Sequence, residues 1–269
     1  MVQERESVPD GLHKRMMDLF KDYLICGGLP HCVDLFLSNH DVVQVRKTQK
    51  TIYDMYGDDA SKYDLNNKMH TKAVLDSIPS SIENKRKRVF AKDIEGKENA
   101  RFSDYKDDFE NLVDSGVVLQ VICCSNPVFP LRESSKRNLL KLYMCDVGIL
   151  TCILYRNNVK PLREDIPQIN LGNVYGCVAA MQLSANGHTL YYSDNKKYGE
   201  VDYLIDDYDG LSVKALEIKS GKDHKRHNAI DKLIEINGDY CEGIVLSNSR
   251  TIESDGKVTY LPIYALMFL

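Results

Sequence analysis

The hydrophobic residues near the start of the chain recur at helical spacing. They are Leu12, Met16, Leu19, Phe20, Tyr23 and Leu24. The pair Gly27-Gly28 then interrupts the pattern, as glycines commonly do at the end of a helix. Asp41 with Gln44 three residues later resembles a capping box, which predicts a helix running to about Tyr56. We therefore expect a small helical subdomain over residues 1–66.

From about residue 67 the pattern changes to helix, basic run, helix and short apolar strand. The second helix is expected over residues 100–115 and ends at Gly116, and the strand is expected over residues 117–122. A proline-rich loop at residues 126–130, where the chain reverses direction, is expected after the strand. This order is that of a winged helix, so we expect a winged-helix-like domain over residues 67–165.

Two features of this second region leave its role open. The helix over residues 100–115 has two cations against five carboxylates, and phosphates repel such a surface. For this helix, a structural or protein-contact role is therefore the alternative to recognition of DNA bases. The basic run Lys85, Arg86, Lys87 and Arg88 is either a phosphate contact or a solvated loop.

The last region, residues 166–269, combines helical and alternating patterns. Expected helices span residues 173–185 and 225–236, and expected strands span residues 189–193, 200–205, 213–219, 243–246 and 258–262. Pro262 in the short final strand favours the edge of a sheet. The predicted fold class is α/β (α+β): a helical and winged-helix-like region followed by a mixed sheet flanked by helices.

Ionisable residues mark two neighbouring strands of this last region. Side chains alternate along a strand, so Glu200 shares a face with Asp202, and Glu217 shares one with Lys219. Two carboxylates and an ammonium that converge in this way can hold Mg²⁺ and act on a phosphodiester. The alternative is a network of surface ion pairs at the end of the sheet.

The chain resembles the uncharacterised C-terminal domain that follows AAA-type ATPase modules in many bacterial and archaeal proteins. The residues that carry the resemblance run in order along nearly the whole chain. They are Tyr23-Leu24 to Gly27-Gly28-Leu29-Pro30, the helix ending in Asp114-Ser115-Gly116, Lys141-Leu142-Tyr143 with Asp146-Val147-Gly148, Glu200-Val201-Asp202, and Glu217-Ile218-Lys219-Ser220-Gly221.

The resemblance implies a restriction-endonuclease-like PD-(D/E)xK fold in the last region. It implies that Asp202 and Glu217 hold the metal, with the Ile218 carbonyl as a further ligand, and that Lys219 is the positioned cation. DNA and an AAA-type ATPase module are the implied partners. The alternative function is a catalytically inactive interaction or regulatory module with the same fold.

Two departures from that family affect these expectations. No GxxxxGK[ST] motif is present, so the chain has no ATP site of that kind and is either a stand-alone copy or a fragment of a longer ATPase. The helix before the first strand also has Gly176 and Gln182 where acidic residues are expected. Loss of a helix carboxylate should weaken metal binding.

Further cations follow the Glu217-Ile218-Lys219 motif. Lys222, Lys225 and Arg226 are candidate nucleic-acid contacts at the start of the next helix, where a bound phosphate would interact favourably with the helix dipole. A solvated turn is the alternative. These cations could attract nucleic acid only as a local patch. Residues 172–269 hold 10 basic and 14 acidic side chains, and the net charge of the chain is −4.

Composition narrows the class of protein. The eight cysteines form no CxxC pair and lie mostly among apolar neighbours, so we expect reduced core residues. No stretch approaches the roughly 20 apolar residues of a membrane helix, and the start of the chain is charged. A cytoplasmic protein is expected, and the sequence does not indicate its oligomeric state.

Overall fold

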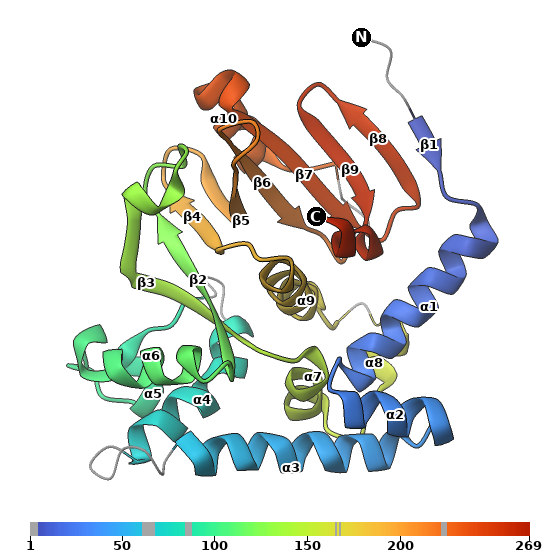
Figure 1. Cartoon of the computed structure of the whole chain (residues 1–269), viewed down its shortest axis with the longest axis vertical. Helices are drawn as coiled ribbons and strands as arrows, with labels where there is room; N and C mark the ends of the chain where they lie inside the picture. Colours follow the sequence, from blue (N-terminus) through green and yellow to red (C-terminus); the bar gives the residue numbers. More distant parts are fainter. Residues whose placement is uncertain (1–4, 61–67, 84–87, 165, 167, 222–224) are drawn as a thin grey trace. The chain divides into compact units, whose positions relative to one another are not determined.

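The computed structural model describes the chain except for residues 1–4, 61–67, 84–87, 165, 167 and 222–224 (Figure 1). The α-helices in the described part are α1 (Asp10–Cys26), α2 (Pro30–Asn39), α3 (Val42–Ala60), α4 (Lys68–Glu83), α5 (Ala91–Glu95), α6 (Lys106–Asp114), α7 (Val147–Tyr155), α8 (Lys160–Arg163), α9 (Gly172–Ala185) and α10 (Asn228–Asn237). None of the described helices combines the length and apolar character needed to cross a membrane.

The strands described are β1 (Arg5–Ser7), β2 (Val118–Cys124), β3 (Ser135–Met144), β4 (Tyr191–Asn195), β5 (Gly199–Asp207), β6 (Ser212–Ile218), β7 (Cys241–Ser247), β8 (Thr251–Asp255) and β9 (Val258–Pro262). Short 3-10 helices are η1 (Phe102–Tyr105), η2 (Leu131–Ser134), η3 (Gly238–Tyr240) and η4 (Ile263–Phe268). The predicted mixed sheet flanked by helices is confirmed.

The chain divides into two compact units, each built from separate segments. The sheet unit comprises residues 1–20, 121–139 and 170–269, and the helical unit comprises residues 21–120 and 140–169. The chain passes from one unit to the other within α1, β2 and β3. The expected last boundary, after residue 165, lies near the passage after Ile169, whereas the expected boundary at residue 66 lies outside the described residues. The three-domain division stays a prediction.

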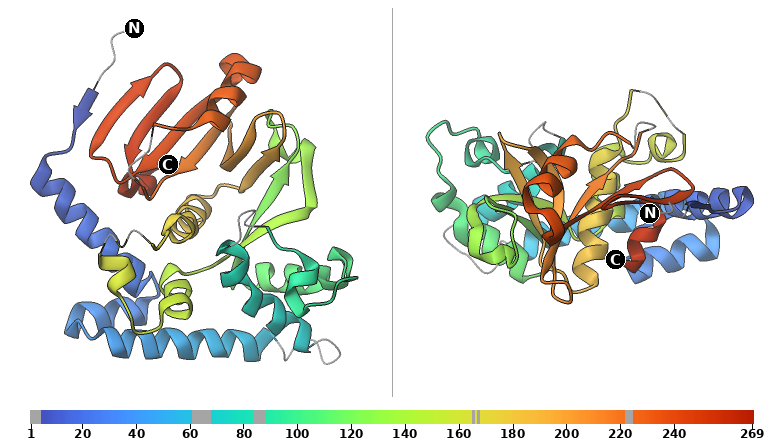
Figure 2. Two further views of the ribbon diagram at one scale, coloured as in Figure 1. Left: turned by 180° about the vertical axis from the view of Figure 1, so that it is seen from behind. Right: turned by 90° about the horizontal axis from the view of Figure 1, so that it is seen from above.

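In the described residues, nine strands form one mixed sheet in the order β1-β8-β9-β7-β6-β5-β4-β2-β3. Strands β4, β5 and β6 are successive antiparallel neighbours, whereas β7 runs parallel to β6. A parallel neighbour requires a crossover connection, and α10 supplies it. Figure 2 (left) shows β1 beside the β8–β9 hairpin, where it pairs with β8.

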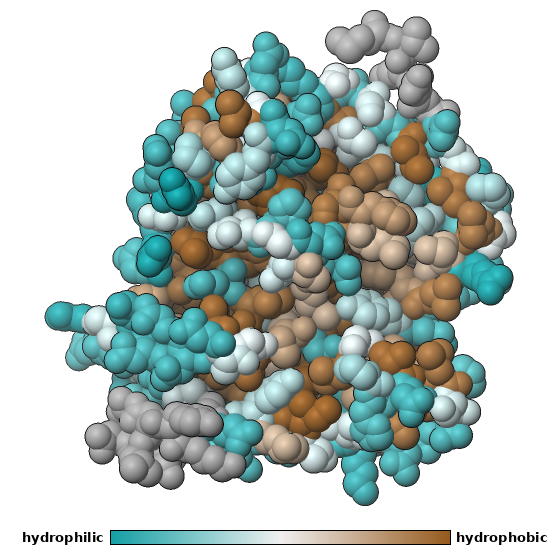
Figure 3. All heavy atoms as spheres, viewed as in Figure 1, coloured by the Kyte–Doolittle hydropathy of each residue, from teal (hydrophilic) through white to brown (hydrophobic). Residues whose placement is uncertain are grey.

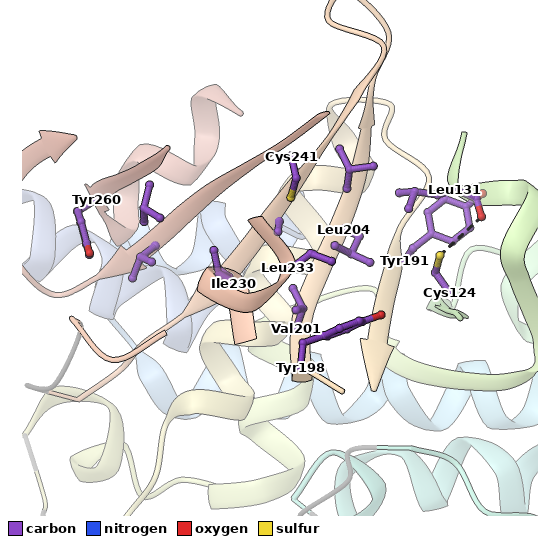
Figure 4. Close-up of a cluster of buried hydrophobic side chains, with 14 residues drawn as sticks. Cys124, Leu131, Tyr191, Tyr198, Val201, Leu204, Ile230, Leu233, Cys241 and Tyr260 are labelled. Atoms are coloured by element: carbon purple, nitrogen blue, oxygen red, sulfur yellow. Dashed lines mark hydrogen bonds between the residues drawn. The ribbon is translucent and has the colours of Figure 1, made fainter. Parts of the chain in front are cut away.

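The two faces of this sheet are covered by different helices. Leu204 packs in a buried cluster with Ile230 and Leu233 of α10 (Figure 4). Its neighbour Tyr203 points to the other face, where its hydroxyl donates a hydrogen bond to the Gly176 carbonyl of α9 at 2.7 Å. Adjacent strand residues therefore face α10 and α9 in turn, and both faces are apolar because both are buried.

The helical unit is organised around the long helix α3, which packs against α2, α4 and α7. Arg46 of α3 is 1% exposed, and its Nη1 donates to the carbonyls of Ile25 and Gly148 and to the side chains of Gln49 and Thr151 at 3.0 to 3.3 Å. Gln49 also donates to the Ile25 and Cys26 carbonyls. These bonds satisfy the last carbonyls of α1 with side chains of α3.

Asp146 joins the end of α1 to the start of α7. One carboxylate oxygen accepts the Ile149 N–H at 2.9 Å, which caps α7, and the other accepts the Gly28 N–H at 2.7 Å. Burial raises the pKa of Asp146, and hydrogen bonds from the amides of Gly28 and Ile149 oppose that rise. Gly27, at φ +70°, leaves room for this carboxylate, which a Cβ atom would meet at 2.2 Å.

Several local predictions need correction. Helix α3 continues through Gly57 to Ala60, so Gly57 does not end it. The helix expected over residues 100–115 starts later, as η1 followed by α6. Strand β9 lies between β7 and β8, so Pro262 does not mark a sheet edge. Its pairing with β8 ends at Tyr260, and Pro262 therefore needs no ladder hydrogen bond on that side.

The close packing of α7 on the end of α1 gives a first prediction. A Cβ atom on Gly148 would lie 2.7 Å from the Gly27 nitrogen and 2.8 Å from the Cys26 carbonyl carbon. Because backbone atoms cannot move aside as a flexible side chain can, Gly148→Ala should lower the free energy of unfolding by about 1–3 kcal/mol. Urea denaturation followed by circular dichroism measures it.

The matched control is Gly11→Ala, also within a helix, where a Cβ atom would meet nothing within 4 Å. This change should leave the stability unchanged or raise it by about 0.5–1 kcal/mol, because alanine favours the helix. Equal stabilities of the two variants would contradict the packing described for Gly148.

Candidate functional site

Asp202 of β5 reaches the end of β6. The regular pairing of these antiparallel strands extends as far as Tyr203 opposite Leu216. One residue further along, the Asp202 carboxylate accepts a hydrogen bond from the backbone N–H of Ile218 at 3.1 Å. Ile218 lies between Glu217 and Lys219, so the carboxylate of Asp202 binds the centre of this motif.

An irregularity in β5 explains how Asp202 is placed. Tyr191 of β4 lies opposite Leu204 and Ser193 lies opposite Val201, so Tyr192 alone faces two residues of β5. Those two residues are Asp202 and Tyr203. A bulge of this kind bends the strand and changes the direction of its side chains, and it is common beside functional sites.

Glu217 and Lys219 lie side by side at the end of β6. The Lys219 ammonium contacts a carboxylate oxygen of Glu217 at 2.7 Å, and the two side chains are 26% and 15% exposed. The backbone N–H of Lys219 donates to the Leu246 carbonyl of β7 at 2.8 Å, which fixes the end of the strand. The structure thus pairs Lys219 with Glu217 and joins Asp202 to the backbone of Ile218, which lies between them.

Helix α9 has no carboxylate at positions 176 and 182, where the resemblance leads one to expect acidic residues. Gly176 is buried in α9 with its carbonyl bound by the Tyr203 hydroxyl, and Gln182 is partly buried. No group of three His, Cys, Asp or Glu residues within the described residues could hold a metal ion. Glu200 lies on β5, two residues before Asp202, and is partly buried.

The residue types present at the end of β6 suit Mg²⁺. This ion prefers oxygen ligands and keeps several water molecules, so one or two carboxylates are sufficient protein ligands. Asp202 and Glu217 meet that requirement. Asp202 already accepts a hydrogen bond from the Ile218 N–H, and Glu217 accepts one from the Lys219 ammonium. The residues fit an open site with two carboxylates and not an all-protein cage.

Only three of the candidate nucleic-acid contacts, Arg88, Lys225 and Arg226, belong to the part of the chain that the structure describes. Lys225 is exposed and forms a 2.7 Å ion pair with Glu253 of β8, and β9 and β7 lie between β8 and β6. Arg226 is exposed beside it. Arg88 lies in the helical unit and is partly buried. Four of the expected contacts lie outside the described residues: Lys85, Arg86, Lys87 and Lys222.

Sequence analysis missed a polar group that surrounds the turn after β6. Asn248 donates to the Ser220 carbonyl at 3.1 Å, and the Asn170 side chain accepts the Gly172 N–H at 2.8 Å. The Ser220 hydroxyl lies 3.5 Å from the same Asn170 oxygen. These residues tie the start of α9 to the end of β6. Their types are common in any turn, so the sequence carried no specific signal for them.

A second missed group lies at the start of α10. His227 contacts the Asp231 carboxylate at 3.0 Å through Nδ1 and the Tyr260 hydroxyl through Nε2. Burial, followed by the nearby carboxylates of Asp255 and Asp231, raises the pKa of Tyr260. His227 and Asp231 are four residues apart, one helical turn, and this spacing in the sequence favours a side-chain contact between them.

The hydrogen bond from Tyr203 to α9 gives a second prediction. Tyr203→Phe removes the donor and leaves the buried Gly176 carbonyl without it, so the free energy of unfolding should fall by about 1–3 kcal/mol. The control is Tyr208→Phe in the turn directly after the same strand, where the side chain is 72% exposed and stability should change by less than about 0.5 kcal/mol. Equal losses in urea denaturation would argue against the role of Tyr203.

Comparison with known proteins identifies the family but no activity. No curated protein and no solved structure matches the chain. A protein-family model described as "Domain of unknown function (DUF8612)" matches residues 17–160, more than half of the chain. This segment contains Gly27, Asp146 and Gly148, and it ends before Asp202 and Glu217. The chain therefore belongs to the DUF8612 family, an uncharacterised domain family.

Proposed function

We propose that this protein is a divalent-cation-dependent phosphodiesterase that acts on DNA. The observation that carries the proposal is the contact of the Asp202 carboxylate with the Ile218 amide, between Glu217 and Lys219. This contact supports the proposal because it joins Asp202 of β5 to the end of β6, where Glu217 and Lys219 flank Ile218. Two carboxylates and an ammonium are a minimal set of residue types for metal-assisted cleavage of a phosphodiester.

The arrangement of the sheet unit supports the same proposal. The expected order of helix, three strands, helix and strand occurs as α9, β4, β5, β6, α10 and β7. This order accords with the restriction-endonuclease-like fold that the resemblance implies. We also propose, on the resemblance alone, that the protein works with an AAA-type ATPase carried elsewhere.

Each residue has a separate role in the proposed reaction. Asp202 and Glu217 would hold Mg²⁺, which supplies charge neutralisation at the phosphate and a more acidic bound water. The Ile218 N–H orients the Asp202 carboxylate, as a fixed donor that needs no rearrangement. Lys219, anchored by Glu217 and by its backbone bond to Leu246, offers an ammonium to a phosphate oxygen.

A second candidate function is an interaction module that does not cut. The Lys219 ammonium is bound to Glu217, and neither Gly176 nor Gln182 supplies a helix carboxylate. The acidic helix α6 favours a protein contact over a phosphate contact, although Asp108 is buried and accepts a hydrogen bond from Thr71. In this second function the three ionisable residues stabilise the end of β6.

Cleavage assays separate the two functions. With Mg²⁺ or Mn²⁺ and supercoiled plasmid or single-stranded DNA, Lys219→Ala should reduce the cleavage rate by at least about 10²-fold, because a positioned charge at the phosphate is lost. The matched control is Lys214→Ala, on the same strand but paired with Asp207 at 3.4 Å, and it should cleave as fast as the unaltered protein. Equal rates for Lys219→Ala and the unaltered protein would refute the enzyme.

Metal binding can be measured without turnover. Calorimetric titration with Mn²⁺ should give one site, and the double variant Asp202→Asn with Glu217→Gln should lose it, because neutral amides bind hard cations far more weakly than carboxylates. Asp207→Asn, at the opposite end of β5, should retain it. Unchanged titration of the double variant would exclude these two residues as the ligands.

A further inference from the structure

An exposed apolar patch lies at the end of β5 and β6 opposite to Asp202 and Glu217. It is formed by three segments of the sheet unit: residues 127–132, 206–214 and 235–242. The patch residues are Val128, Tyr208, Leu211, Ile236 and Tyr240, which are 44%, 72%, 60%, 45% and 66% exposed. They are five of the twelve large hydrophobic residues exposed in the described part of the chain.

Contacts among the three segments hold the patch together. The Phe129 ring meets the Tyr208 ring edge-on, with centroids 5.5 Å apart. The Asn237 side chain donates to the Pro127 carbonyl at 2.6 Å, and the Leu131 N–H donates to the Asp206 carboxylate at 3.0 Å. The loop before β3 therefore joins the end of α10 to the β5–β6 turn, and Val128 lies between these attachments.

The patch is continuous with the core of the sheet unit. Leu131, Tyr191, Leu233 and Cys241, labelled in Figure 4, belong to the buried cluster, and Phe129 and Ile234 pack against it. In Figure 3, hydrophobic residues reach the surface among hydrophilic ones near the position of α10. The exposed side chains thus stand on a rigid base, which lowers the entropy lost when a partner binds.

Leu211 is held outward by an unusual backbone. Its φ is +48°, a conformation that glycine and asparagine adopt more readily than leucine. The neighbouring Gly210 would ordinarily supply such a conformation in a tight turn. Leu211 is thus both strained and 60% exposed, and backbone strain of this kind is common at functional positions.

The charges around the patch determine which sign of charge a binding partner should carry. The three segments contain six carboxylates and two cations, Arg132 and Lys214, and Lys257 from outside them pairs with Asp239, so carboxylates remain in excess. Asp209, Glu235 and Glu242 are exposed, and a hydrogen bond from Lys257 lowers the pKa of Asp239, which stays ionised at neutral pH. A rim of negative charge attracts a cationic segment and repels nucleic acid and anionic lipid.

We propose that this acid-rimmed apolar patch docks a cationic amphipathic segment of another polypeptide, whose aliphatic side chains cover Tyr208, Leu211 and Tyr240. Tyrosine and neighbouring aliphatic residues form the dry centre of many such contacts, and the carboxylates form the polar rim. The patch is separate from the proposed phosphodiesterase site, so either proposal can fail without the other.

The test uses the full chain and two synthetic probes. A fluorescently labelled amphipathic helical peptide of Leu and Lys is titrated beside a Leu and Glu peptide of the same pattern, with fluorescence anisotropy as the readout. We expect the Lys peptide to bind at least about tenfold more tightly than the Glu peptide. The double variant Leu211→Asn with Tyr240→Ser should weaken that binding by at least about tenfold.

This variant keeps the net charge and replaces Leu211 by a residue that tolerates positive φ, so folding should be retained. Circular dichroism verifies it. The control variant is Leu37→Gln with Val43→Gln, which removes two exposed apolar side chains of α2 and α3 and should bind like the unaltered protein.

Four outcomes overturn the proposal. The first two are equal binding of the Lys and Glu peptides, and unchanged binding of the Lys peptide by the patch variant. The third is self-association of the unaltered protein in sedimentation equilibrium that the patch variant abolishes. The fourth is binding of the unaltered protein to neutral phosphatidylcholine vesicles that the same variant abolishes. The third outcome assigns the patch to a second copy of the chain, and the fourth assigns it to a lipid surface.

Discussion

The directions of the two strands beside β6 constrain the whole sheet unit. Because β5 is antiparallel to β6, the beginning of β5 lies beside the end of β6, and Asp202 can reach Ile218. Because β7 is parallel to β6, the chain must leave the sheet after Lys219 and return through α10. The same constraint therefore brings Asp202 beside the end of β6 and requires the helix that covers one face of the sheet.

The helical unit relies on buried polar groups rather than on apolar packing alone. Arg46 and Gln49 bind the final carbonyls of α1, and Asp146 binds the amides that follow. Such groups are costly to bury unless they are bonded, so they specify one arrangement of α1, α3 and α7. The family match, over residues 17–160, covers all of these residues.

Much of the sheet unit could be predicted, because β5, β6 and β7 are short segments rich in apolar residues and glycines mark the ends of α1 and α9. Strand β8 could not, since Thr251, Glu253 and Ser254 are polar residues whose pairing with β9 decides their conformation. The contact between Asp202 and Ile218 depends on a bulge opposite Tyr192, which no local pattern reveals. The ion pair of Lys225 with Glu253 is likewise a long-range contact that spacing does not encode.

The discontinuity of the two units limits how the protein can be dissected. Strand β2, which is contributed from within the family segment, pairs with β4 through Ile122 and Cys123. A truncated fragment that begins at α9 would lose this strand and present the backbone of β4 to solvent as an open template for aggregation. The segment that matches the family model therefore supplies a strand to the sheet that carries the ionisable residues.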